Sequence, residues 1–209
     1  QITRLDREST GPILQQLEQK VIEILTEEIQ GTDAIIFSDY SKGFLTENLI
    51  QRLKQAALAL NLPVLVDTKP SKVRYYKGST LFKPNIREVE EITGIKYTSY
   101  EDTQKLKRIG TSLFEELNPT YVLFTLGEDG MVVYSSPEVF DYIPSRKVEN
   151  ADVSGAGDTV IASLAASLAA GYSILESAKI ANCAASIAVG KRGTATCSLE
   201  ELTDILKNE

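Results

Sequence analysis

The sequence predicts an α/β protein with a mostly parallel sheet flanked by helices on both faces. Short apolar segments that resemble buried strands alternate with longer segments of helical periodicity, as in parallel sheets whose strands are joined by helices. Several strand-like segments also end on polar residues, as in open α/β sheets with a ligand site. The 209 residues can bury one sizeable core and contain no repeat or convincing linker, so we expect one domain over residues 1–209.

The first half of the chain alternates helix and strand. Apolar residues recur at helical spacing over residues 12–30, and Thr46 is a good N-cap for a second helix that residues 61–63 end. The predicted elements are a helix over 12–30, a strand over 33–38, a helix from Thr46 to about Leu60, and strands over 64–67 and 80–83.

The second half continues the alternation and adds a hairpin. Residues 127–130 have the composition of a turn, after which two short strand-like segments are expected to pair. The predicted elements are helices from about 86 to 92 and over 103–117, a strand over 121–125, hairpin strands over 131–134 and 139–143, and helices near 156–170, 174–189 and 198–207.

Polar residues stand at or just after the ends of four predicted strands: Asp39, Asp67, Asn85 and Thr125. The carboxyl ends of parallel strands meet at one edge of the sheet, where ligands bind in open α/β proteins. We therefore expect these four side chains to gather at a ligand site.

A glycine-rich loop at residues 152–159 lies between a strand-like run, residues 140–148, and a helix of small apolar residues. Gly155 and Gly157 let the backbone turn tightly and bring N–H groups close to a ligand at the helix N-terminus, where the helix dipole favours an anion. Asp158 would repel that anion unless it accepts a proton from the group that attacks it. The loop therefore indicates phosphoryl transfer to a hydroxyl. The alternative is that Asp158 only complements the helix dipole.

The composition excludes several other kinds of chemistry. The dinucleotide fingerprint needs a third glycine where Val160 stands, and the P-loop pattern does not occur. Because the chain contains no histidine, proton transfer falls to carboxylates and lysines. The spacing of Cys183 and Cys197 fits no zinc pattern and favours reduced cytosolic thiols.

Charge and hydropathy limit the partners and the location that we expect for the protein. A formal net charge of −7 without a basic block argues against nucleic acid and anionic membranes as partners. Residues 1–30 lack the pattern of a signal peptide, and the weakly polar run over 160–170 is too short for a membrane span. We expect no nucleic-acid partner, no membrane partner and a cytoplasmic location.

Residues 152–158 resemble the C-terminal signature of the ribokinase-like (PfkB) carbohydrate kinases, Asp-Thr-x-Gly-Ala-Gly-Asp. Residues 38–43, 80–85 and 189–194 resemble the heptose 7-phosphate kinases of that family, which include the kinase domain of bifunctional heptose kinase/adenylyltransferases. The resemblance extends through almost all of the chain. It implies a ribokinase-like fold and ATP- and Mg²⁺-dependent phosphoryl transfer to a hydroxyl of a sugar or sugar phosphate, heptose 7-phosphate first among them.

The resemblance gives the glycine loop its catalytic roles. Asp158 is the implied general base, and the N–H groups of Gly155, Ala156 and Gly157 would stabilise the transferred phosphoryl group. One alternative is a nucleotide-binding or regulatory fragment without turnover of its own. A second, a dinucleotide-dependent oxidoreductase, is disfavoured by the broken fingerprint.

Asn85 and Glu88 match the family's Asn-x-x-Glu motif, in which Asn85 would face the phosphates and Glu88 would hold Mg²⁺ through water. The alternative is a plain helix cap followed by a glutamate at the third helical position. Asp152, Ser154 and the loop near Gly193 resemble a monovalent-cation site, for K⁺, found in several family members.

Further positions are candidates to bind the nucleotide and the acceptor. The resemblance places around the nucleotide Thr125, Gly127, Gly130, Asn182, Gly190 and Gly193. Turn geometry is the alternative for the glycines near the hairpin, and a small helix–helix contact is the alternative for the asparagine. Candidates to contact the acceptor or the phosphates are Asp39, Lys42, Asp67 and Lys69. Their alternative is a set of solvated pairs at loop ends.

Family kinases normally begin with an N-terminal portion that supplies a Gly-Gly sugar-binding motif, early strands and a small β-lid. The resemblance covers the C-terminal two-thirds of such a domain, so we expect residues 1–209 to form its nucleotide-binding part without the N-terminal part and the lid. Gln1 at the start and Met131 as the only methionine lead us to expect an incomplete reading frame. We expect this piece alone to expose a sheet edge and to bind ATP weakly without turning over a sugar, and the protein to be a homo-oligomer, a dimer.

Overall fold

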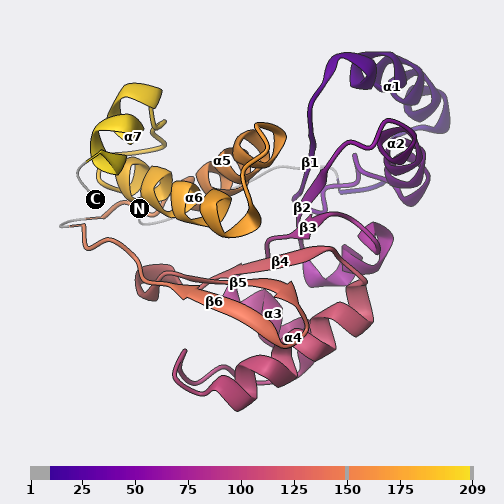
Figure 1. Cartoon of the computed structure of the whole chain (residues 1–209). Coiled ribbons are helices and arrows are strands. Elements are labelled where there is room, and N and C mark those ends of the chain that lie inside the picture. The colour runs from indigo at the N-terminus through magenta and orange to yellow at the C-terminus, as the bar shows by residue number, and fades with distance from the viewer. Residues whose placement is uncertain (1–9, 149–150, 208–209) are drawn as a thin grey trace.

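The computed structural model describes residues 10–148 and 151–207, which form a sheet with helices on both faces (Figure 1). The described strands make one six-stranded sheet in the order β1-β2-β3-β4-β5-β6. Their bounds are β1 (Ile35–Asp39), β2 (Val64–Thr68), β3 (Leu81–Phe82), β4 (Tyr121–Thr125), β5 (Met131–Ser136) and β6 (Val139–Ile143). β1 to β4 run parallel, and β5 and β6 continue the sheet as an antiparallel hairpin, which confirms the predicted fold class.

The helices divide between the two faces of the sheet (Figure 1). On one face lie α1 (Gln15–Glu28), α2 (Glu47–Ala59), α3 (Ile86–Thr93) and α4 (Thr103–Leu117). On the other lie α5 (Ala156–Ala169) and α6 (Ile174–Val189), with α7 (Leu199–Leu206) packed against α6. Among the described residues, no helix is both long and apolar enough to cross a membrane.

Successive side chains of the central strands enter different cores. Val64 and Val66 of β2 pack among the helices α1 to α4, whereas Leu65 between them packs against α5 and α6. Leu81 and Phe82 of β3 divide in the same way. The alternation follows from the pleat of a strand, and each fully buried side chain of this size contributes about 1.5–3 kcal/mol. Both faces of the sheet are therefore anchored, which fixes the ends of the strands.

Residues Pro70–Tyr76 form a 3₁₀ helix that the sequence did not predict. Its buried side chains, Val73 and Tyr76, recur after three residues, which is the repeat of a 3₁₀ helix and differs from the α-helical period. The Tyr76 ring packs on Phe37 with 5.3 Å between ring centroids, and its hydroxyl donates a 2.7 Å hydrogen bond to Asp39 Oδ2. The 3₁₀ helix thus packs against the end of β1 on the face of the sheet that α1 to α4 cover.

β1 is an edge strand among the strands that the structure describes, as expected. A groove of about 520 Å³ runs along it and is lined by apolar side chains that include Leu25, Ile29, Ile36 and Phe44. The Ile36 side chain is exposed in this groove although it lies in the middle of a strand. The apolar groove and the edge strand together form an interaction-prone face of the molecule.

Candidate active site

A cleft of about 470 Å³ lies at the carboxyl ends of β1 to β4, beside the start of α5. It brings together the polar strand-end residues, with Asp39 from β1, Asp67 from β2, Asn85 after β3 and Thr125 from β4. A parallel bridge between Asn85 and Thr125 extends the sheet to the mouth of the cleft. The other predicted residues that line it are Lys69, Glu88, Gly155, Gly157 and Asp158.

The glycine loop turns into α5 with the geometry of an anion site. Gly155 is the N-cap residue of α5 and has a φ of 80°, in the left-handed region that glycine adopts without strain. No described side chain caps this helix N-terminus, so its first-turn amides remain available to a ligand. The Ala156 N–H group donates a 3.2 Å hydrogen bond to the Val153 carbonyl, which leaves Gly155 and Gly157 as the more accessible donors.

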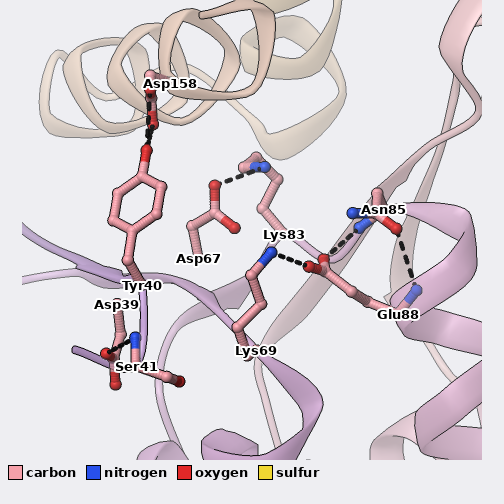
Figure 2. Close-up of polar contacts among 9 residues, drawn as sticks. All are labelled: Asp39, Tyr40, Ser41, Asp67, Lys69, Lys83, Asn85, Glu88 and Asp158. Carbon is pink, nitrogen blue, oxygen red and sulfur yellow. Dashed lines mark hydrogen bonds and ion pairs between the residues drawn. The ribbon is translucent and has the colours of Figure 1, made fainter. Parts of the chain in front are cut away.

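Asp158, in the first turn of α5, directs its carboxylate toward the cleft (Figure 2). The hydroxyl of Tyr40, which follows β1, lies 3.3 Å from Oδ1 and 3.2 Å from Oδ2 of Asp158. The charge of Asp158 raises the pKa of the Tyr40 phenol, because a phenolate would face a carboxylate. Sequence reasoning missed Tyr40, whose partner lies 118 residues away in the chain.

Lys83 is a second residue of the site that sequence reasoning missed. It is only 4% exposed, and its Nζ atom lies 2.8 Å from Asp67 Oδ2. A Cβ atom placed on Gly157 would be 3.4 Å from the same Nζ atom, so the lysine lies directly against the glycine loop. The only signal in the sequence was a lysine at the end of a buried strand. Burial raises the pKa of Asp67, and the charge of Lys83 acts against that shift.

Asn85 and Glu88 form the helix cap that was the alternative to a metal-binding role. Asn85 Oδ1 accepts a 3.0 Å hydrogen bond from the Glu88 N–H group, and Glu88 Oε2 accepts a 2.9 Å hydrogen bond from the Asn85 N–H group. Glu88 Oε1 accepts a 2.9 Å hydrogen bond from Lys69, and this bond raises the pKa of the lysine (Figure 2). Each carboxylate oxygen keeps a second lone pair, so Glu88 can still accept a hydrogen bond from a metal-bound water.

The charged residues at and after the ends of β1 and β2 differ in burial, and Asp67 and Lys69 have partners other than each other. Asp39 is buried, and its Oδ1 accepts a 2.8 Å hydrogen bond from the Ser41 N–H group. Asp67 pairs with Lys83, whereas Lys69 pairs with Glu88. Lys42 lines the groove along β1, which shares Ser38, Asp39 and Tyr40 with the active-site cleft.

Asp152 ties the glycine loop to the loop after α6. Its Oδ1 accepts a 3.1 Å hydrogen bond from the Ser154 N–H group, and its Oδ2 accepts a 2.9 Å hydrogen bond from the Gly193 N–H group. Hydrogen bonds from Ser154 and Gly193 lower the pKa of Asp152. The Asp152 N–H group also donates to the Val189 carbonyl at 2.8 Å. Two segments predicted to serve the phosphates and the adenine are thus joined through one carboxylate.

The remaining predicted nucleotide positions have clear structural tasks. Gly130 has a φ of 106°, and a Cβ atom there would overlap the Ile143 carbonyl oxygen, so the hairpin itself requires glycine. The Asn182 side chain donates a 2.8 Å hydrogen bond to the Pro144 carbonyl, tying α6 to the segment after β6. Gly127 begins the 3₁₀ turn Gly127–Asp129, and Gly190 is the C-cap residue of α6.

The family comparison agrees with this arrangement: residues 7–202 match the family described as pfkB family carbohydrate kinase. The chain belongs to the pfkB family of carbohydrate kinases. Proteins with similar sequences include the bifunctional protein HldE of Pelobacter propionicus, 42% identical over 202 residues, and that of Trichlorobacter lovleyi, 39% identical over 202 residues. These matches cover 97% of this chain but 41% and 40% of the two relatives, so the chain spans about two fifths of their length.

Solved pfkB-family structures share the fold. Phosphofructokinase-2 from Escherichia coli in complex with potassium superposes with a TM-score of 0.73 and 20% identity, covering 91% of this chain and 62% of that one. Ribokinase from Arabidopsis thaliana, complexed with ribose and ATP, gives a TM-score of 0.73 and 19% identity, covering 88% of this chain and 59% of that one. At this level of identity the likeness establishes the ribokinase-like fold.

Proposed function

We propose that the protein transfers the γ-phosphoryl group of ATP to a hydroxyl of a sugar phosphate, with Asp158 as general base. The observation that carries the proposal is the position of Asp158. Its carboxylate opens into a polar cleft and already accepts hydrogen bonds from a hydroxyl, one residue after the glycine-loop amides. When a general base lies this near to an anion site, the two together are suited to the attack of a hydroxyl on a phosphoryl group.

The proposed reaction uses each group for a separate task. Asp158 takes the proton of the acceptor hydroxyl as its oxygen attacks the γ-phosphorus, and the bond from that phosphorus to the bridging oxygen of ADP breaks. The Gly155 and Gly157 amides, with the Lys83 ammonium group beside them, stabilise the charge on the transferred group. Mg²⁺, when bound with ATP, neutralises phosphate charge, and Asn85 and Glu88 are the residues that would hold it through water.

Heptose 7-phosphate is the acceptor that we propose. Its support is the resemblance of residues 38–43, 80–85 and 189–194 to the heptose 7-phosphate kinases, together with the HldE relatives at about 40% identity. Lys42 and Lys69 stand near the cleft and supply the positive charge that a sugar phosphate needs.

A K⁺ ion near Asp152, a homo-oligomeric state and a cytoplasmic location complete the proposal. The potassium complex and the tetrameric form of E. coli phosphofructokinase-2 support the first two by likeness of fold. The cytoplasmic location is supported by the proposed use of ATP and by Cys183 and Cys197, which form no disulfide.

A coupled assay of ADP release by the full-length protein tests the proposal. The acceptors compared are heptose 7-phosphate, fructose 6-phosphate and ribose, each with ATP and Mg²⁺. We expect heptose 7-phosphate to give the highest kcat/KM. Turnover of another acceptor alone would correct the substrate, and ATP binding without turnover of any acceptor would favour a nucleotide-binding module.

A further inference from the structure

The hydroxyl of Tyr40 sits where an acceptor hydroxyl must sit to be deprotonated. A general base needs its proton donor within about 2.6–3.2 Å, and the Tyr40 hydroxyl lies 3.2 Å and 3.3 Å from the two Asp158 carboxylate oxygens. Figure 2 shows the phenol reaching across the cleft from the end of β1 to the first turn of α5. Among the described residues, Tyr40 is the side chain for which a hydrogen bond to Asp158 is seen.

The Tyr40 side chain is exposed and has room to change rotamer, whereas hydrogen bonds to neighbouring residues hold the backbone that carries it. Tyr40 is 59% exposed and lines both the active-site cleft and the groove along β1. On either side of it, Asp39 accepts hydrogen bonds from Ser41 and Tyr76, and Ser41 has a φ of 57°. An exposed ring on a fixed backbone can swing into the adjoining groove by a change of rotamer alone.

We propose that Tyr40 is a positioning residue that holds the place of the acceptor hydroxyl on Asp158 and leaves it when the sugar phosphate binds. The inference rests on the proposed function and adds a control on it. When ATP alone is bound, a water on Asp158 could give up its proton and attack the γ-phosphorus, which would release ADP and inorganic phosphate. The Tyr40 hydroxyl occupies that position instead, so ATP is not hydrolysed until an acceptor hydroxyl displaces the phenol.

The phenol suits this task because it is a poor competitor for the phosphoryl group. The charge of Asp158 raises the pKa of Tyr40, so the phenol stays protonated at neutral pH and donates its proton to the carboxylate in a hydrogen bond. The contact is exposed and near the long limit for a hydrogen bond, so an acceptor can replace it at small cost.

Kinetics of Tyr40→Phe in the full-length protein give the first test, because the substitution keeps the ring and removes the hydroxyl. We expect acceptor-independent ATP hydrolysis to rise on the order of 3–10-fold, the effect of losing one hydrogen bond of ordinary strength, since this contact is long and exposed. KM for heptose 7-phosphate should fall by a similar factor. Tyr172→Phe, at an exposed tyrosine between α5 and α6, is the matched control and should change neither value. Unchanged hydrolysis and KM in Tyr40→Phe would overturn the proposal.

Titration of Tyr40 gives a second test that needs no activity. The protein carries nine tyrosines, so a ¹³Cζ-tyrosine label is used and the Tyr40 resonance is assigned by its loss in Tyr40→Phe. We expect Asp158→Asn to lower the Tyr40 pKa toward its ordinary value, and heptose 7-phosphate without ATP to do the same in the wild type. Equal pKa values in wild type and Asp158→Asn would overturn the proposal.

The two tests separate this inference from the proposed function. If no acceptor in the panel supports ADP release by the wild type, the proposed function fails. The Asp158→Asn titration and acceptor-independent hydrolysis by Tyr40→Phe still decide whether Tyr40 covers Asp158. If sugar phosphate turnover is robust but both Tyr40 readouts are unchanged, the proposed function stands and the role of Tyr40 is wrong.

Discussion

The Nζ atom of Lys83 lies 2.8 Å from Asp67 Oδ2 and against the glycine loop at Gly157, which puts a buried cation behind the proposed phosphate site. Burying a lysine costs free energy, and the ion pair with Asp67 offsets that cost. Removing either partner leaves the charge of the other without compensation. In the proposed reaction, the same ammonium group faces the phosphate oxygens of the nucleotide. The pair therefore couples the stability of the sheet edge to the chemistry of the cleft.

Lys83→Met should destabilise the protein by about 3 kcal/mol, the lower end for breaking a buried pair, because part of Asp67 faces the cleft. Urea unfolding measures the loss, and ATP affinity should fall with it. The loss should shrink toward acidic pH, since protonation of Asp67 removes the unpaired charge. The double variant Lys83→Met/Asp67→Asn is the control and should recover part of the stability; a double variant as unstable as the single one would contradict the pairing.

Asp158→Asn should reduce turnover by about 10²–10⁴-fold, because the amide keeps the shape of the side chain and cannot accept the proton. ATP affinity should hold or improve, since a negative charge near the phosphates is removed. Steady-state kinetics and calorimetry measure the two quantities. Asp141→Asn, at an exposed position of β6, serves as the control for loss of a carboxylate elsewhere. Near-normal turnover in Asp158→Asn would remove this residue from the mechanism.

Asp152→Ala should weaken ATP binding, because it removes the carboxylate that accepts hydrogen bonds from Ser154 within the glycine loop and from Gly193 in the loop after α6. It should also abolish any activation by K⁺ if the cation binds at this carboxylate. Titration calorimetry with ATP, in K⁺ and in Na⁺ buffers, measures both effects. Gly193→Ala is a useful companion: its φ of 75° makes any side chain strained, so it should disturb the loop while leaving the carboxylate in place. A K⁺ response that survives Asp152→Ala places the cation elsewhere.

Glu201 should stabilise the protein above about pH 4.5 and lose that contribution as the pH falls toward 2. Hydrogen bonding to Lys191 lowers the pKa of Glu201 from 4.5 to about 2 in the folded protein, and a carboxyl with a depressed folded pKa stabilises only above its unfolded pKa. Glu201→Gln should therefore be less stable than wild type at pH 6 and equally stable near pH 2. Chemical unfolding at a series of pH values measures the difference, and a difference that does not vary with pH would show that the Lys191 pair is not its source.

Local sequence patterns were enough to predict where most helices and strands lie and to select the glycine loop as the candidate phosphate site. The helices predicted over residues 103–117 and near 174–189 are present as α4 and α6, and the apolar run at 121–125 predicted β4. These signals are local, because a helix or strand face is defined by residues three to four, or two, positions apart. Two glycines and an aspartate before a helix are likewise a local pattern, and they were enough to indicate an anion site beside a base.

Which charged and polar groups meet depends on the three-dimensional packing of the chain. Placement after the same strand suggested Asp67 with Lys69, yet the parallel register of β2 and β3 brings Lys83 to Asp67 and leaves Lys69 to Glu88. Tyr40 reaches Asp158 because β1 and α5 pack against each other, although the two residues are 118 positions apart. Such pairs depend on strand register and helix packing, which are set by burial over the whole chain and leave no period in the sequence.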